Sequence, residues 1–356
     1  MTDLPPSRRR LLTWATTLPA AMRAGQLSAT PSPAVVVPFA EDPKLLVAGP
    51  ADGALNRWAD ALLPALQQSL PPDTSIRRVE VGSADGVTGA NQFEVRGGPD
   101  GQTVLLAPGQ AALAWMVGDP RAKFDVAHWV PVVAGTGVGL VVGRASVFAG
   151  DPRARVVATN PAGSDLAALL GLYLLGVRME VVFGPVEPGA AQKAFLQGSA
   201  DAVMLHGQRV PEQFAALQTA GAQPLFTLGA LDDTGNLVRD PAYPQVPHFS
   251  ELYALRTGVQ PTGPLYDAWC ASAAASQLVF GMVLPQLTPA AMVSLWRRAG
   301  SDAVASLGVQ TVAASANVRP LAGPIATTNT AAIAASAAAM QELRGWLAGR
   351  LNWRPA

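Results

Sequence analysis

The side chains that most often carry out catalysis are few in this sequence and are widely separated. The single cysteine, Cys270, lies in an apolar stretch where we expect a small core residue, and one cysteine excludes an intramolecular disulfide. The three histidines are too far apart for a His-Glu metal box. Asp201, His206 and Glu187 surround one predicted strand and loop, but no nucleophile stands in a recognisable frame beside them. We therefore expect no catalytic residue, no metal site and no cofactor.

A glycine-rich stretch is the second pattern that could support chemistry. Gly137, Gly139 and Gly143 imitate a dinucleotide-binding loop, but the third glycine is one position late. The residues 140–142 are Leu-Val-Val, which is typical of a strand and not of a helix that holds a pyrophosphate at its N-terminus. A flexible crossing between two lobes is the favoured interpretation. An α/β enzyme with a nucleotide at residues 135–143 is the alternative.

The positive signal comes from four strand-to-helix turns built of small residues, at 49–53, 108–111, 160–165 and 184–190. Each turn offers backbone N–H groups at or near a helix N-terminus, where unpaired donors and the helix dipole favour an anion. Small side chains also let a ligand approach the backbone closely. Every α/β protein has such turns, but four of this composition in a chain without catalytic groups favour a binding protein.

Composition narrows the class of protein further. The chain has 356 residues, of which 49% are hydrophobic, so it has ample material for a core and is not intrinsically disordered. The 25 basic and 25 acidic residues balance, and charged residues make up only 14%. Because nucleic-acid binding needs a clustered basic surface, this neutral composition argues against it.

The N-terminus has the plan of an export signal. Three arginines at 8–10 precede a mostly apolar stretch at 11–22, and Arg8-Arg9 look like a twin-arginine signal. A disordered basic tail is the alternative, because Arg23 interrupts the apolar stretch. We take residues 1–29 as a twin-arginine-like signal and expect a periplasmic protein.

Short apolar runs alternate with helical periods along the rest of the chain. Helices are expected from Ala54, after a cap at Ser164 or Asp165, around 189–196, and in the alanine-rich segment 327–351. Strands are expected at 44–48, 76–81, 103–107, 129–133, 140–143, 156–159, 180–183, 202–205 and 224–228. The alternation predicts an α/β protein with largely parallel sheets. The uncharged run 268–296 predicts a buried strand leading into a loop and helix, not a membrane span.

Five segments resemble one family, the periplasmic solute-binding proteins of the tripartite tricarboxylate transporters (the Bug family). Residues 81–91, VGSADGVTGAN, resemble its glycine-rich GAxGxxGA stretch, and residues 99–106, PDGQTVLL, are similar to its PDGYTLL. FD at 124–125 with WVPV at 129–132 is similar to YD followed by DFxPV. Residues 189–204 look like GxxxxxLLAGQVDLMF, and PQVPHFSE at 244–251 resembles PDVPTxxE. The segments keep the family's order.

The resemblance implies a type II periplasmic-binding fold of two lobes, each a mostly parallel sheet flanked by helices. We expect one lobe from 30–137 plus 222–356 and the other from 138–221, with hinges near 134–139 and 206–222. It also implies a monomeric, non-enzymatic receptor that captures a small organic acid or related metabolite. The partner would be the membrane permease of a secondary transporter. A sensory module that signals to a membrane kinase is a further alternative.

The family holds a carboxylate mainly with backbone amides of the first two turns, while the second lobe reads the rest of the ligand. Carried over by position, the implied binding residues are Ala51, Asp52, Gly53, Asn56, Pro108, Gly109, Gln110, Ala111, Asn160, Gly163, Ser164, Asp165, Gly184 and His206. Asp52 departs from the family's PGGxxD turn, and its carboxylate would repel a ligand carboxylate unless it points to solvent. An amine-bearing, amide or neutral ligand therefore stays open.

Overall fold

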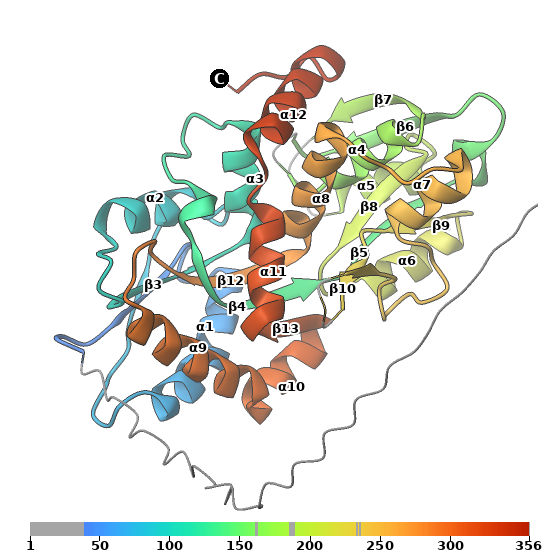
Figure 1. Cartoon of the computed structure of the whole chain (residues 1–356). Helices are drawn as coiled ribbons and strands as arrows, with labels where there is room; N and C mark the ends of the chain where they lie inside the picture. The colour runs from blue at the N-terminus through green and yellow to red at the C-terminus, as the bar shows by residue number, and fades with distance from the viewer. Residues whose placement is uncertain (1–38, 161–162, 185–188, 233, 235, 356) are drawn as a thin grey trace, which may run out of the picture. The chain divides into compact units, whose positions relative to one another are not determined.

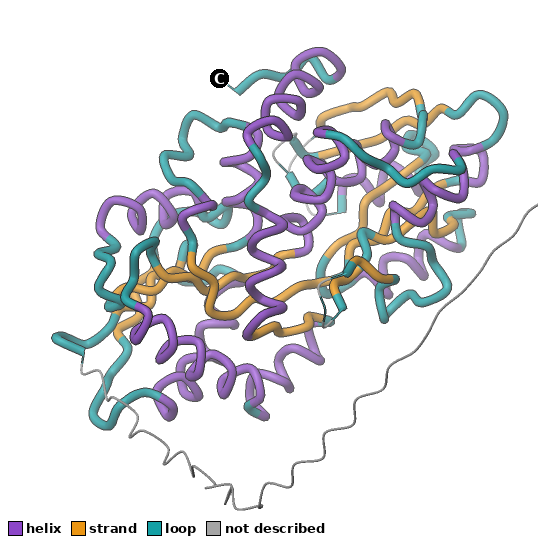
Figure 2. Tube along the Cα trace, viewed as in Figure 1, coloured by secondary structure: helices purple, strands orange, loops and turns teal. Residues whose placement is uncertain are grey.

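The computed structural model describes residues 39–355 with the exception of 161–162, 185–188, 233 and 235. All of these residues lie in one compact unit, Val37–Ala356. The predicted export signal, residues 1–29, lies outside the described residues. The unit is a mixed α/β structure with two main sheets flanked by helices, which confirms the predicted fold class (Figures 1 and 2). No helix in this described part is long and apolar enough to span a bilayer.

The larger sheet has the strand order β13-β4-β12-β3-β1-β2. Its strands are β1 Lys44–Val47, β2 Arg77–Glu80, β3 Thr103–Ala107, β4 Val130–Gly137, β12 Leu278–Leu284 and β13 Val318–Ala322. β1 pairs in parallel with β2 and β3, whereas β12 pairs antiparallel with β3 and β4, and β13 pairs antiparallel with β4.

The smaller sheet has the order β7-β6-β8-β5-β9. Its strands are β5 Gly139–Gly143, β6 Arg153–Ala158, β7 Arg178–Phe183, β8 Ala202–His206 and β9 Gln223–Thr227. β6 is parallel to β7 and β8, and β5 is antiparallel to β8 and β9. A short hairpin of β10 Ala230–Leu231 and β11 Leu237–Val238 follows.

Both sheets are therefore mixed, which corrects the expectation of largely parallel sheets. Strands joined through a helix return to the same edge and run parallel, as β1–β3 and β6–β8 do. Val138 alone joins β4 to β5, so β5 begins at the edge where β8 ends, with Gly139 opposite His206. β12 likewise begins beside the end of β4, with Leu278 opposite Thr136. In each sheet, the parallel strands end at the edge that faces Val138. The carboxyl edges of the two sheets therefore meet at the crossing from β4 to β5.

Helices cover both faces of the larger sheet. The helices are α1 Ala54–Ser69, α2 Val87–Arg96, α3 Gly109–Val117, α4 Leu166–Leu174, α5 Ala190–Leu196, α6 Val210–Gln218, α7 Phe249–Thr257, α8 Pro264–Gln277, α9 Ala290–Ala305, α10 Leu307–Ala316, α11 Gly323–Ile333 and α12 Ala337–Arg350, with 3-10 turns at Val126–His128 and Ala145–Phe148. Successive side chains of a strand alternate between faces. Leu45 therefore joins the core under α1 and α9, and Leu46 joins the core under α2 and α3.

Two predicted elements differ from the structure. Residues 268–277 form the end of α8 instead of a strand, so Cys270 lies on a helix, and β12 begins only at Leu278. The segment AWCASAAASQ has no β-branched residue and is rich in alanine, which favours a helix even without a clear amphipathic period. The predicted helical segment at 327–351 is two helices, because the chain breaks after α11 and Ser336 caps α12 by accepting a hydrogen bond from the Ala339 N–H.

The glycines of the crossing are explained by packing. A Cβ placed on Gly135 would lie 2.1 Å from the Phe280 ring, and one on Gly139 would lie 2.7 Å from Leu228 Cδ1. Both glycines are in strands, and no helix follows them that could hold a pyrophosphate. These contacts favour the crossing and give the nucleotide alternative no support.

The segment by which the chain leaves the smaller sheet lies later than the second hinge expected from the sequence, 206–222. Those residues include α6, and the next strand, β9, still pairs with β5 in the smaller sheet. The chain leaves that sheet only after Thr227. The division of the chain into two lobes stays a prediction.

Candidate functional site

The turns after β1, β2 and β3 meet at one edge of the larger sheet, because these strands are parallel neighbours. Gly86, which precedes α2, has φ +76°, and a Cβ there would lie 2.5 Å from Pro108 Cδ. A Cβ on Gly89 would lie 2.6 Å from Ala48 Cα. The start of α3 and the end of β1 are thus both in contact with the α2 segment, and glycine is needed at both points of approach.

In the first turn, Ala51 and Asp52 are exposed and Gly53 is the N-cap residue of α1. Asp52 and Gly53 line a surface hollow along α1, together with Arg57. Asn56 is buried, and its Nδ2 donates to the Pro50 carbonyl over 2.7 Å, which closes the turn. The exposure of Asp52 fits an N-terminal carboxylate that faces water.

The second turn carries Pro108 as the N-cap residue of α3, with Gly109 and Ala111 buried and Gln110 half-buried. A Cβ on Gly109 would lie 1.9 Å from the Ala275 carbonyl oxygen of α8. Gly109 therefore lets the start of α3 approach the end of α8, a structural role that its sequence context did not reveal.

The third turn, before α4, is closed by its own side chains. Asp165 Oδ2 accepts hydrogen bonds from the Thr159 N–H at 3.0 Å and from Thr159 Oγ1 at 3.1 Å. The Gly163 N–H donates to the Asn160 carbonyl at 3.0 Å, and the Ser164 carbonyl accepts from Ser276 Oγ of α8. Asp165 is the N-cap residue of α4, although its side chain makes no capping hydrogen bond. Its carboxylate is committed to holding the turn.

The last predicted residues lie on neighbouring strands of the smaller sheet. The Gly184 N–H donates to the Ala158 carbonyl at 3.1 Å, which extends the pairing of β7 with β6. His206 ends β8, is exposed, and lines a cavity of about 370 Å³ together with Gly189 and Arg209. The turns before α5 and α6 therefore share one hollow. Glu187 lies outside the described residues.

Two hydrogen bonds connect the turns of the two sheets. Arg57 Nη1 in the first turn of α1 donates to Gln208 Oε1 over 3.0 Å. Asn317 Nδ2 at the start of β13 donates to the Gln208 carbonyl over 2.9 Å. The loop between β8 and α6 thus contacts the larger sheet at the edge where its strand–helix turns lie. Among the described residues there is no cluster of histidine, cysteine or acidic side chains that could hold a metal.

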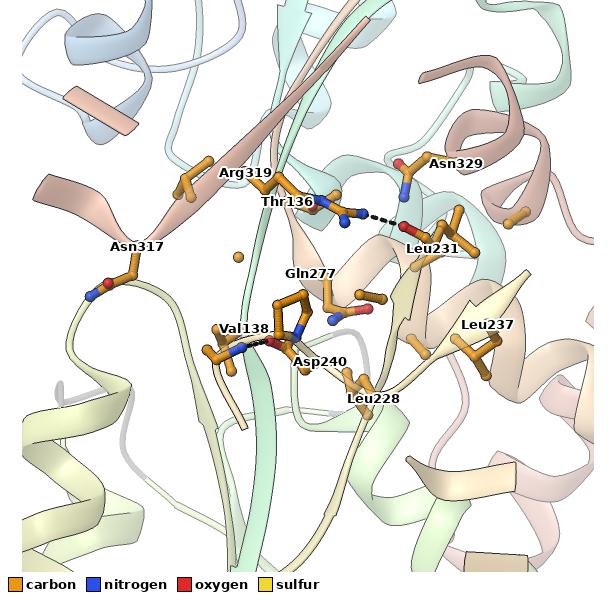
Figure 3. Close-up of a pocket in the computed structure, with 18 of the residues that line it drawn as sticks. Thr136, Val138, Leu228, Leu231, Leu237, Asp240, Gln277, Asn317, Arg319 and Asn329 are labelled. Atoms are coloured by element: carbon orange, nitrogen blue, oxygen red, sulfur yellow. Dashed lines mark hydrogen bonds between the residues drawn. The ribbon is translucent and has the colours of Figure 1, made fainter. Parts of the chain in front are cut away.

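Sequence reasoning missed a cavity of about 450 Å³ beside the crossing strands (Figure 3). None of the fourteen predicted binding residues lines it. Its charged side chains are Asp240, from the loop after β11, and Arg319, from β13. Asn329 of α11 also lines it, as do the polar side chains of Thr136, Tyr266, Gln277 and Asn317. The only hint in the sequence is a charged residue, Arg319, inside an apolar strand.

The cavity contains titratable groups with perturbed pKa values. Burial raises the pKa of Asp240, although the Ala242 N–H and the charge of Arg319 oppose that shift. Burial also raises the pKa of Cys270 to about 11. A thiol with such a pKa is protonated at neutral pH, so Cys270 is not an activated nucleophile. Cys270 is half-buried against the core and also lines this cavity.

Comparison with known proteins shows the fold. No protein-family model matches the chain, and no curated protein sequence matches it. A TctC solute-binding protein from Polaromonas, solved without ligand, has 17% identity and a TM-score of 0.62, with 86% of this chain and 97% of that protein covered. MatC from Rhodopseudomonas palustris with bound malate has 18% identity and a TM-score of 0.47, covering 85% of this chain and 96% of MatC. A second R. palustris protein, solved with adipate, has 15% identity and a TM-score of 0.49, covering 85% and 97%.

The match to the Polaromonas protein extends over nearly all of that protein and over most of this chain. The described chain therefore has the fold of a TctC-type periplasmic solute-binding protein, as the sequence resemblance predicted.

Proposed function

We propose that the chain is an exported solute-binding receptor that holds a small organic acid between two lobes. The observation that carries the proposal is the meeting of both carboxyl edges at Val138, in a chain with the TctC fold. Ligands of open α/β sheets bind beyond the carboxyl ends of the strands. The turns before α1 and α3 then face those before α4, α5 and α6, with Arg57 and Gln208 in contact between them.

A carboxylate is the ligand group that these turns favour. Helix N-termini present unpaired N–H donors and a partial positive charge. Two acidic side chains lie in the described parts of the turns: Asp165 accepts hydrogen bonds from Thr159, and Asp52 is exposed. Neither needs to face a bound anion. The fourteen residues carried over from the family are the proposed binding residues.

The same proposal includes four further points. The protein is exported through a twin-arginine-like signal, works in the periplasm, delivers its ligand to a membrane secondary transporter, and acts as a monomer without catalysis. The similarity to a solute-binding protein supports the receptor role. The direct crossing at Val138 supports hinged closure of the lobes, because one residue joins β4 of the larger sheet to β5 of the smaller sheet.

The test is thermal unfolding of the full chain against mono-, di- and tricarboxylates, amino acids and amides. A ligand at 100 times its Kd stabilises the folded state by about 2.7 kcal/mol, which raises the Tm by a few degrees. We expect at least one of the carboxylates to raise the Tm. Isothermal titration with the best compound should then give one site and no product. A shift with no carboxylate, or turnover of any compound, would contradict the receptor proposal.

Asp52→Ala tests whether the first turn touches the ligand. Because Asp52 is exposed at the N-terminus of α1, removing its charge should leave carboxylate affinity unchanged or strengthen it. An amine-bearing ligand should instead bind more weakly. If neither affinity moves, Asp52 is not in the site.

A further inference from the structure

The cavity beside the crossing strands has the size and composition of a binding site. At about 450 Å³ it lies within the roughly 300–1,000 Å³ of small-molecule pockets. Its wall is mostly apolar and comes from the crossing, the β10–β11 hairpin, α8, α10 and α11. The apolar wall includes Val138, Leu228, Leu231, Leu237, Trp269 and Ala273. An apolar group of a ligand would pack against these side chains and be removed from water.

One buried polar atom in the cavity has no partner among the described groups. Asn329 is only 4% exposed, and its Oδ1 accepts no hydrogen bond from any described residue. Asn329 belongs to α11 and lines the cavity, and Figure 3 shows its amide directed toward the side where Arg319 lies. An unsatisfied buried acceptor is destabilising, so a donor brought by a ligand would be favourable there.

Two opposite charges line the same cavity. Arg319 is half-buried and donates through Nη2 to the Leu231 carbonyl over 2.6 Å, which leaves other N–H groups of its guanidinium for an acceptor. Asp240 is 6% exposed, and one of its oxygens accepts from the Ala242 N–H at 2.9 Å. The cavity therefore offers a cation, a carboxyl group and a neutral acceptor without a partner among the described residues, beside the polar side chains of Thr136, Tyr266, Gln277 and Asn317.

We propose that this cavity binds an apolar α-amino acid as its zwitterion. The carboxylate of the ligand pairs with Arg319, and its ammonium donates to Asn329 Oδ1 and Asp240. The side chain lies among the leucines and Trp269. Because both the ligand and the Arg319–Asp240 pair are neutral overall, binding buries no net charge. The site differs from the strand–helix turns, none of whose predicted residues lines the cavity.

The first experiment is isothermal titration of the full chain with L-leucine as the probe. Two analogues separate the parts of its head group: 4-methylpentanoate lacks the ammonium group, and isopentylamine lacks the carboxylate. Each analogue leaves one side of the polar set unpaired, so we expect each to bind about tenfold more weakly than leucine or worse. Equal affinity of leucine and 4-methylpentanoate would overturn the role of Asn329 and Asp240.

A matched pair of variants assigns the site. Ala332 is half-buried on α11 and lines the cavity, whereas its neighbour Ala331 is exposed and does not. Ala332→Leu should fill part of the cavity and weaken leucine binding about tenfold or more, and Ala331→Leu should leave it unchanged. Asn329→Leu keeps the volume and removes the acceptor, so it should weaken leucine while raising the Tm of the ligand-free chain.

The outcomes separate this site from the organic-acid site. Leucine binding lost in Ala332→Leu while carboxylate binding at the strand–helix turns persists would support the proposal. Leucine binding that Ala332→Leu leaves unchanged, or that a bound carboxylate displaces competitively, would assign the amino acid to the turns and overturn it. No leucine binding to the wild-type chain would also overturn it, without bearing on the organic-acid receptor.

Discussion

Gly109 allows the sharpest prediction about the proposed site. It begins α3 and is buried, and a Cβ built on it would lie 1.9 Å from the Ala275 carbonyl oxygen and 2.9 Å from Leu278 Cβ. Real Cβ atoms do not approach so closely, and the nearest atom belongs to backbone that cannot rotate away. Extra methylenes in a packed core typically cost about 1–3 kcal/mol. Because α3 or α8 must move here, we expect Gly109→Ala to lower the free energy of unfolding by about 3 kcal/mol or more.

The measurement is urea unfolding followed by far-UV circular dichroism and by tryptophan fluorescence. Gly345→Ala is the matched control, because Gly345 is exposed inside α12 and a Cβ there would meet nothing within 4 Å. Alanine is a better helix former than glycine by about 1 kcal/mol, so the control should gain stability. A Gly109→Ala variant as stable as the wild type would refute the packing argument and return Gly109 to ligand approach alone.

Two further substitutions test the turns and strands of the smaller sheet. The pKa of Asp201 is lowered mainly by its side-chain hydrogen bonds with Arg155. The stability that Asp201 contributes is therefore fully present above the pKa of the unfolded state, about 3.9, and is lost as the pH falls through the lower pKa of the folded state. Asp201→Asn should therefore lower the Tm by a few degrees at pH 7, and by progressively less in acid; a gap independent of pH would contradict this assignment. Asp165→Ala removes both hydrogen bonds to Thr159 and should cost about 2 kcal/mol in urea unfolding. Amide exchange should then speed up at the Thr159 N–H, and unchanged protection there would show that the carboxylate does not hold the turn.

Periodicity was sufficient to predict most of the strands and the first helix. β3 has the bounds that its apolar run predicts, Thr103–Ala107, and α1 begins at Ala54 as its buried face predicts. Alternation and helical spacing are local properties, because each records which side of one element is buried. The resemblance to the Bug family added the order of these elements, and the fold agrees with it.

Long-range features needed the tertiary structure. The alanine-rich end of α8 carries no clear period, so periodicity alone does not separate it from a strand. It is a helix that packs against α3, α4, α11 and α12. The antiparallel direction of β5 follows from the crossing at Val138, and the larger sheet is mixed because β12 and β13 are antiparallel to their neighbours. Both facts are visible only when the pairing of the strands is known.

The roles of individual site residues depend on partners far away in the chain. Gly109 looks like a ligand-binding glycine until Ala275 is seen against it, and Asp165 looks like a cap until Thr159 is seen to occupy it. Arg319 and Asn329 share a cavity with Leu231, which lies on a distant hairpin. Residue type and spacing indicate which groups are able to bind a ligand. Packing decides which of these groups already have partners. A donor, an acceptor or an apolar surface is paired with its nearest neighbour in space, and that neighbour is often far away in sequence.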